Sequence, residues 1–125
     1  SLYLGYYCHL LEDWTFRHFL YDTIGITPTP ELAPTLHRDY YLLNAPLLRA
    51  YSLALDFGKP PEIPAPLMTY FPYDTAGLYA ALRAHFTDPA TENETPTLFT
   101  FDMAREYIAI AVADTLNGVQ KAANR

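Results

Sequence analysis

The apolar positions near the start of the chain are too dense for a helix with only one apolar face. From Leu2 to Tyr21 the sequence has no Pro and a single Gly, and apolar residues fall on nearly every side of the predicted helix. A helix that is apolar all round is typically a central, buried element. We therefore expect a buried helix that ends near Asp22, with Gly25 in the left-handed conformation that closes many helices.

A second helix is predicted from residue 31 to residue 44. It carries an apolar stripe at helical spacing, which consists of Leu36, Tyr40, Leu43 and Leu47. Pro46 removes a backbone donor and clashes with the preceding turn, so it is expected to break or kink this helix before a short continuation to Tyr51.

Two further helices are predicted in the second half of the chain. Asp74 is a suitable N-cap for a helix over residues 75–86, with Leu78 and Leu82 facing inward. Thr100 or Asp102 then begins a last long helix, whose stripe runs from Phe101 to residue 119.

The connectors between these helices are rich in Pro. The sequence predicts extended or polar surface loops over residues 26–34, 56–73 and 87–97. There is no internal repeat, and no alternation with the period of a strand persists for more than a few residues. The sequence therefore predicts an all-α bundle of about four helices with long Pro-rich loops, and its 125 residues predict a single domain, 1–125.

Composition narrows the classes of partner. The formal net charge is −6 and the 8 Lys and Arg are scattered, which argues against nucleic acid and against an anionic membrane surface. No apolar run approaches the ~20 residues of a transmembrane helix, so none is expected. The lone Cys8 cannot form an internal disulfide. A single cysteine and an N-terminus without the basic region of a signal peptide together favour a cytoplasmic protein. The 11 Tyr residues suggest polar networks in the core or a cavity lined by rings and hydroxyls.

His9 and Asp13 are the main candidates for chemistry. Residues four apart stack on one face of a helix, and this face otherwise holds apolar or small residues. A carboxylate in an apolar setting needs a cation or several donors, and zinc accepts both imidazole nitrogen and carboxylate oxygen. The pair predicts a metal site, while a structural His–Asp hydrogen bond is the simpler alternative.

Other candidate ligands fit this site less well. His18 lies nine residues after His9 and faces away from it on a straight helix, so it joins the site only if the helix bends. His37 and Asp39 are two residues apart in the second helix, so at most one of them points at the first helix. His85 is most simply a surface or half-buried histidine.

Two motifs resemble the bacterial zinc-dependent phospholipase C family. The segment Gly5-Tyr6-Tyr7-Cys8-His9-Leu10-Leu11-Glu12-Asp13 is similar to the Gly-Tyr-x-x-His-Leu-x-x-Asp helix of that family, and residues 39–44 are similar to a downstream Asp-Tyr-x-x-Leu-Asn segment. The resemblance implies an all-α hydrolase of phosphodiesters or phospholipids, with zinc as cofactor. In such an enzyme a zinc-bound hydroxide attacks phosphorus.

The family pattern is incomplete in this chain. The resemblance implies His9 and Asp13 as zinc ligands, with His18, His37 and Asp39 as further candidates. His18 is one residue short of the family spacing, and Tyr41 stands where the family has Glu. The family also takes ligands from a region before this helix. We therefore expect the chain to be part of a larger phospholipase C-like domain, incomplete or inactive as it stands.

Three hypotheses follow. The first is the zinc-dependent hydrolase of a small-molecule or lipid phosphate ester. The second is a non-catalytic bundle with a structural His9–Asp13 pair and an aromatic partner surface. The third is a bundle that binds a ligand in a Tyr-lined pocket. A homo-oligomer is compatible with each of them.

Overall fold

The chain is all-helical in the part that the computed structural model describes, which comprises residues 2–56, 58, 65–70, 74–88 and 93–124. In order along the chain the elements are α1 (Leu2–His18), the π-helical turn η1 (Phe19–Thr23), α2 (Ala33–Ala50), α3 (Ala65–Tyr70), α4 (Thr75–Thr87) and α5 (Phe101–Ala123). The predicted all-α class is confirmed, and the four predicted helices correspond to α1, α2, α4 and α5.

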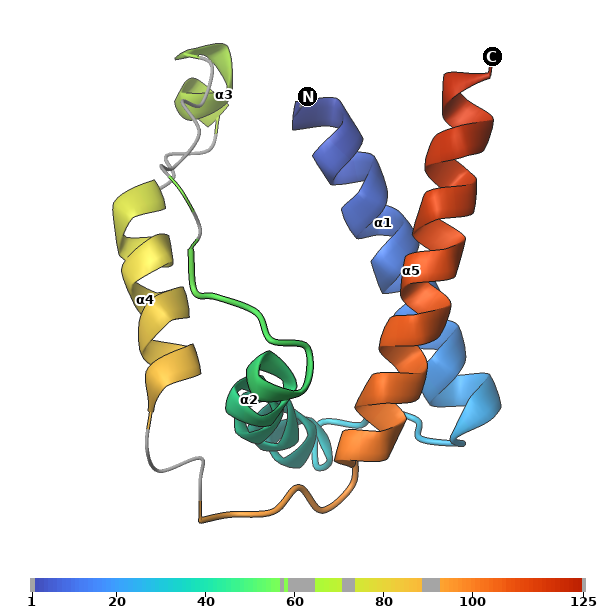
Figure 1. The fold of residues 1–125 in the computed structure, drawn as a ribbon, viewed down its shortest axis with the longest axis vertical. Coiled ribbons are helices and arrows are strands. Elements are labelled where there is room, and N and C mark those ends of the chain that lie inside the picture. The colour runs from blue at the N-terminus through green and yellow to red at the C-terminus, as the bar shows by residue number, and fades with distance from the viewer. Residues whose placement is uncertain (1, 57, 59–64, 71–73, 89–92, 125) are drawn as a thin grey trace.

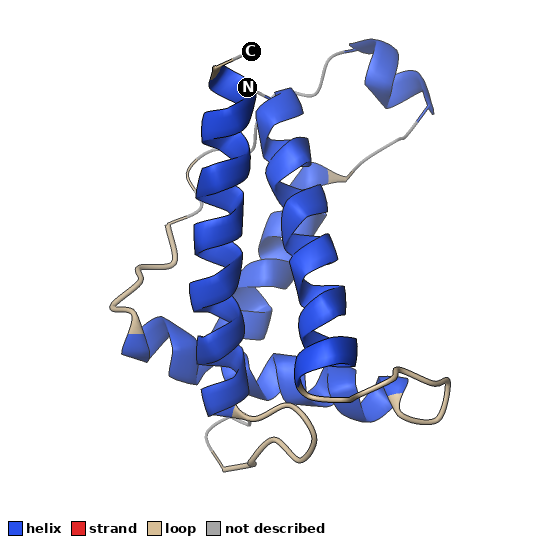
Figure 2. Ribbon diagram, turned by 90° about the vertical axis from the view of Figure 1, so that its right-hand side faces the viewer, coloured by secondary structure: helices blue, strands red, loops and turns tan. Residues whose placement is uncertain are grey.

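The two terminal helices form an antiparallel pair. α1 and α5 pack side by side, so the described chain begins and ends at the same end of the molecule (Figures 1 and 2). α2 crosses the opposite end of this pair and contacts α5, and α4 packs against α2 (Figure 1). The first half of α1 and the second half of α5 consequently extend past α2.

Helix boundaries follow the local signals in the sequence. The carboxylate of Asp74 accepts the backbone N–H of Gly77 at 2.9 Å and so caps α4. The hydroxyl of Thr100 accepts the N–H of Met103 at 3.4 Å and caps α5 in the same way. Gly25 has φ of +69°, the left-handed conformation expected after the first helix.

The Pro residues of α2 and α3 do not interrupt their helices. Of the two outcomes expected at Pro46, a break or a kink, the break is wrong, because α2 continues through Pro46 to Ala50, close to the expected continuation to Tyr51. Leu47 and Leu48, which follow Pro46, are half-buried, and their burial offsets the backbone hydrogen bond lost at Pro46. The segment 56–73, expected to be a loop throughout, contains α3, where Pro66 occupies the first turn and its missing N–H costs nothing.

The core lies where the end of α1, η1, α2 and the start of α5 meet. Its buried members are Phe19, Leu20, Leu36, Leu43, Phe99 and Ala104. The expectation that the first helix is central and buried is therefore wrong for most of its length, because α1 packs mainly against α5 among the described elements and leaves Tyr3, Tyr6 and Trp14 exposed. Leu78 is also exposed rather than inward. In the described residues, no helix combines the length and the apolarity needed to cross a bilayer.

Candidate ligand-binding cleft

His9 and Asp13 lie side by side on α1, as their spacing predicts. His9 Nε2 is 3.3 Å from an Asp13 carboxylate oxygen, and both side chains are 62% exposed. The expected apolar, buried setting is thus wrong, since both side chains are mostly in water. Because water solvates the carboxylate, the pair does not require a metal cation to offset desolvation.

His18 pairs with a different carboxylate. It is the last residue of α1, and its Nδ1 lies 2.6 Å from Asp22 in η1. Its ring also contacts Trp14 edge-on, with 4.4 Å between ring centroids. α1 is continuous from Leu2 to His18, so the helical phase places His18 on the other side of the helix from His9.

Asp39 has a structural role that the sequence did not reveal. It is 1% exposed, and its carboxylate accepts three consecutive backbone N–H groups that lead into α5. The donors are Thr97 at 2.9 Å, Leu98 at 2.6 Å and Phe99 at 2.8 Å. These three bonds account for the burial of the Asp39 carboxylate without a metal ion.

His37 lies on α2, away from both histidines of α1. It shares a hollow of about 270 Å³ with His85 of α4, and the two tyrosines Tyr40 and Tyr41 complete most of its wall. The His85 ring meets Tyr41 edge-on at 5.1 Å. The structure therefore groups His37 with His85 and not with His9.

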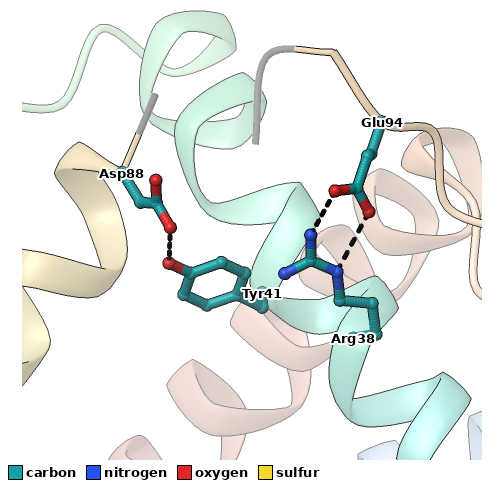
Figure 3. A network of polar contacts seen from close by, with 4 residues as sticks. All are labelled: Arg38, Tyr41, Asp88 and Glu94. Atoms are coloured by element: carbon teal, nitrogen blue, oxygen red, sulfur yellow. Dashed lines mark hydrogen bonds and ion pairs between the residues drawn. The ribbon is translucent and has the colours of Figure 1, made fainter. Parts of the chain in front are cut away.

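A network of polar contacts connects α2 to Asp88, which follows α4, and to Glu94, which precedes α5. Tyr41 donates its hydroxyl hydrogen to Asp88 at the end of α4 (Figure 3). Arg38 donates to the carboxylate of Glu94 from two nitrogens, with Nε 3.1 Å from Oε2. The hydrogen bond to Asp88 raises the pKa of Tyr41. Since all four side chains already have partners within the protein, the network is structural.

The donor set does not fit a multi-zinc centre. Among the described residues there is no group of three or more His, Cys, Asp or Glu side chains that could hold one metal ion. His9 and Asp13 supply two ligands, whereas protein zinc sites use three or four. The residues that the resemblance implied as ligands lie in four separate settings: the His9–Asp13 pair, His18 beside Asp22, Asp39 below the start of α5, and His37 in the hollow with His85.

A cleft lies between α1, α2 and the start of α5, and it is here called the α1/α2/α5 cleft. Its volume is about 300 Å³, at the lower end of the range for small-molecule sites. It is lined by Asp13, Phe16, Tyr40, Leu43, Asn44, Leu47, Phe99, Ala104, Tyr107 and Ile108. Asp13 is the one charged residue that the described part of the chain contributes to this lining.

Aromatic rings fix the shape of the cleft. Phe16 contacts Tyr40, Phe99 and Tyr107 edge-on, with centroid distances of 5.5, 5.7 and 4.9 Å. Tyr40 meets Phe99 in the same geometry at 5.4 Å. Such edge-to-face contacts stabilise ring pairs beyond simple burial, so the wall is formed before any ligand arrives.

The tyrosine hydroxyls in this wall stay protonated at neutral pH. Burial, together with the negative charges of Glu12 and Asp13, raises the pKa of Tyr107 to about 12. Burial and the charge of Asp39 raise the pKa of Tyr40. Tyr107 donates a hydrogen bond of 3.3 Å to the backbone carbonyl of Glu12, which holds its ring against α1.

Sequence reasoning did not identify most residues of this cleft. The abundance of Tyr predicted a cavity with rings and hydroxyls, and Asp13 was singled out for a different reason. Asn44 and Tyr107 were missed, because each is an ordinary helix position until α2 and α5 cross. Comparison with family models, with curated proteins and with solved structures finds no match to this chain.

Proposed function

We propose that this domain binds a small molecule that has an apolar ring and a positively charged head group. The observation behind the proposal is an aromatic-walled cleft whose lining contains one charged side chain, the carboxylate of Asp13. Apolar pockets with a few fixed polar groups are the usual form of small-molecule sites.

The chemistry of the lining selects the ligand. An aromatic or aliphatic ring can lie against Phe16, Tyr40 and Leu47 in the cleft, where it replaces water on apolar surface. An ammonium head beside Asp13 gains a charge-assisted hydrogen bond, and the electron-rich faces of the rings attract cations as well. Asn44 adds a neutral donor and acceptor at the same cleft.

The same electrostatics disfavour an anionic ligand. A phosphate ester in this cleft would meet the carboxylate of Asp13, and Glu12 lies close enough to affect the Tyr107 hydroxyl. Among the described residues, no Lys or Arg lines the cleft to offset this repulsion. The zinc-dependent hydrolysis suggested by the resemblance therefore stays a prediction, and cation binding is favoured over it.

Binding can be tested with phenethylamine and its uncharged analogue phenethyl alcohol as probes. Each is titrated into ¹⁵N-labelled protein, and the amide shifts of Leu43, Asn44 and Phe99 are followed. The amine is expected to bind about fivefold more tightly than the alcohol, which corresponds to ~1 kcal/mol for a half-exposed ion pair.

Two matched variants identify the group responsible. Asp13→Asn should abolish the preference for the amine, because it removes the charge and keeps the shape. Asp22→Asn is the control, since Asp22 also pairs with a histidine four residues before it but lies outside the cleft. Shifts outside the cleft, or an equal loss in both variants, would refute the proposal.

A further inference from the structure

Two of the four histidines of the chain lack the acidic partner that the other two have. The histidines of α1 each lie beside an aspartate four residues further along the chain. In the part of the chain that the structure describes, His37 and His85 make ring contacts with tyrosines instead. The His37 ring lies 6.2 Å from Tyr40, and the His85 ring lies 5.1 Å from Tyr41, measured between ring centroids. The donor atoms of these two imidazoles are therefore left for a ligand.

Both imidazoles line one hollow of about 270 Å³ between α2 and α4, called the His37/His85 hollow below. His37, Tyr41 and Asn44 recur at i, i+4 and i+7, which places them on one side of α2, and His85 comes from α4. Among the described residues, no Asp or Glu lines the hollow. Imidazoles donate from both nitrogens when they are protonated, and the Asn44 amide donates as well. The hollow thus combines hydrogen-bond donors with two tyrosine rings.

The charged groups around the hollow have partners within the protein. Asp88 accepts the Tyr41 hydroxyl hydrogen, and Glu94 is bound by Arg38 (Figure 3). Asp39 is 1% exposed and accepts three backbone N–H groups. The guanidinium carbon of Arg38 lies 5.4 Å from the centre of the Tyr41 ring, so a positive charge stands behind this wall of the hollow. The carboxylates nearby are engaged, whereas the groups that face the hollow favour an acceptor.

We infer that the His37/His85 hollow binds the carboxylate of a small aromatic acid. The two imidazoles bind the carboxylate by charge-assisted hydrogen bonds, and the ring of the acid lies against Tyr40 and Tyr41. A phosphate dianion is disfavoured, because its second negative charge would meet Asp88. The site is separate from the α1/α2/α5 cleft, where Asp13 selects a cation, although Tyr40 and Asn44 line both.

Benzoate and its neutral analogue benzamide test the inference. Each is titrated into ¹⁵N-labelled protein at pH 6.0, within the range in which histidine side chains take up a proton, and the signals of His37, Tyr41 and His85 are followed. Benzoate is expected to bind about fivefold more tightly than benzamide, with saturable shifts centred on these residues. Inorganic phosphate, titrated in the same way, should bind more weakly than benzoate.

Matched variants identify the groups responsible. His37→Gln and His85→Gln should each remove the preference for benzoate, because glutamine is polar and cannot become positively charged. Both histidines are exposed, so these variants should fold as the wild type does, which far-UV circular dichroism checks. His18→Gln is the control, since His18 is a half-exposed histidine outside the hollow.

Four results would each overturn the inference. They are equal binding of benzoate and benzamide, shifts centred elsewhere, a preference that both variants keep or that His18→Gln loses equally, and tighter binding of phosphate than of benzoate. The phenethylamine experiment is decided separately, because neither His37 nor His85 lines the α1/α2/α5 cleft.

Discussion

Replacement of Asp39 should destabilise the fold more than replacement of any exposed carboxylate. Its two oxygens accept the N–H groups of Thr97, Leu98 and Phe99 at 2.6–2.9 Å, and these bonds hold the segment that leads into α5 against α2. Asp39→Asn retains one acceptor oxygen and places an NH₂ group opposite an N–H donor. Asp39→Ala leaves all three donors without a partner.

The expected loss in the free energy of unfolding follows from how deeply the three N–H donors are buried. Leu98 and Phe99 are partly and fully buried, whereas Thr97 is exposed and can bond to water. A buried donor without a partner costs about 1–3 kcal/mol, and hydrogen bonds to a charged acceptor contribute at the upper end of that range. We expect a loss of about 3–5 kcal/mol in the free energy of unfolding for Asp39→Ala, and about 1.5–3 kcal/mol for Asp39→Asn.

Urea unfolding followed by far-UV circular dichroism measures both values. Asp22→Asn is the control, because Asp22 is exposed and its bond to His18 is of the kind that contributes at most about 1 kcal/mol. An Asp39→Asn protein within about 0.5 kcal/mol of the wild type, or no less stable than Asp22→Asn, would show that the three N–H bonds do not hold α5 to α2.

Two further predictions concern Tyr107 and His9. Folding raises the pKa of Tyr107 from its ordinary value near 10 to about 12, so this residue stabilises the fold fully below pH 10 and less as the pH rises towards 12. A shift of about two pKa units corresponds to ~2.7 kcal/mol in the free energy of unfolding, and solvent screening at this half-buried hydroxyl reduces that to about 1 kcal/mol. Urea titrations from pH 9 to 12 should therefore show a smaller loss of stability with rising pH in Tyr107→Phe than in the exposed Tyr3→Phe control. For zinc, two exposed ligands bind weakly, so protein purified without chelator and then dialysed should retain well under one zinc per chain, with equal amounts in His9→Ala. About one zinc per chain that is lost in His9→Ala would instead favour the zinc-dependent hydrolase.

Local interactions explain where sequence reasoning about the fold was correct. The caps at Asp74 and Thr100 and the left-handed Gly25 depend on atoms within three or four residues, so the sequence around them is sufficient evidence. The spacing of His9 and Asp13 predicted their contact for the same reason. Pro46 shows where prediction from local sequence stops. Whether the hydrogen bond lost at a Pro ends a helix depends on how much apolar surface the next turn buries, and that burial is set by other parts of the chain.

The candidate site depended on contacts between distant segments. Asp39 and Phe99 are 60 residues apart, and nothing near Asp39 in the sequence indicates that its carboxylate will meet three N–H groups. The α1/α2/α5 cleft combines Asp13, Asn44 and Tyr107 only because α2 crosses the antiparallel pair. Periodicity describes one helix at a time, so it cannot indicate which polar residues of different helices will share a hollow.

The helix α1 shows most clearly what the sequence determined and what only the tertiary structure decided. Its dense apolar composition determined that it is a helix and that several of its sides favour burial. Which sides are buried was decided by tertiary packing, in which α5 covers one side of α1 and leaves His9, Asp13, Tyr6 and Trp14 mostly in water. The physical reason is that hydrophobic burial has no direction of its own, so the partner of an apolar face is set by the path of the rest of the chain.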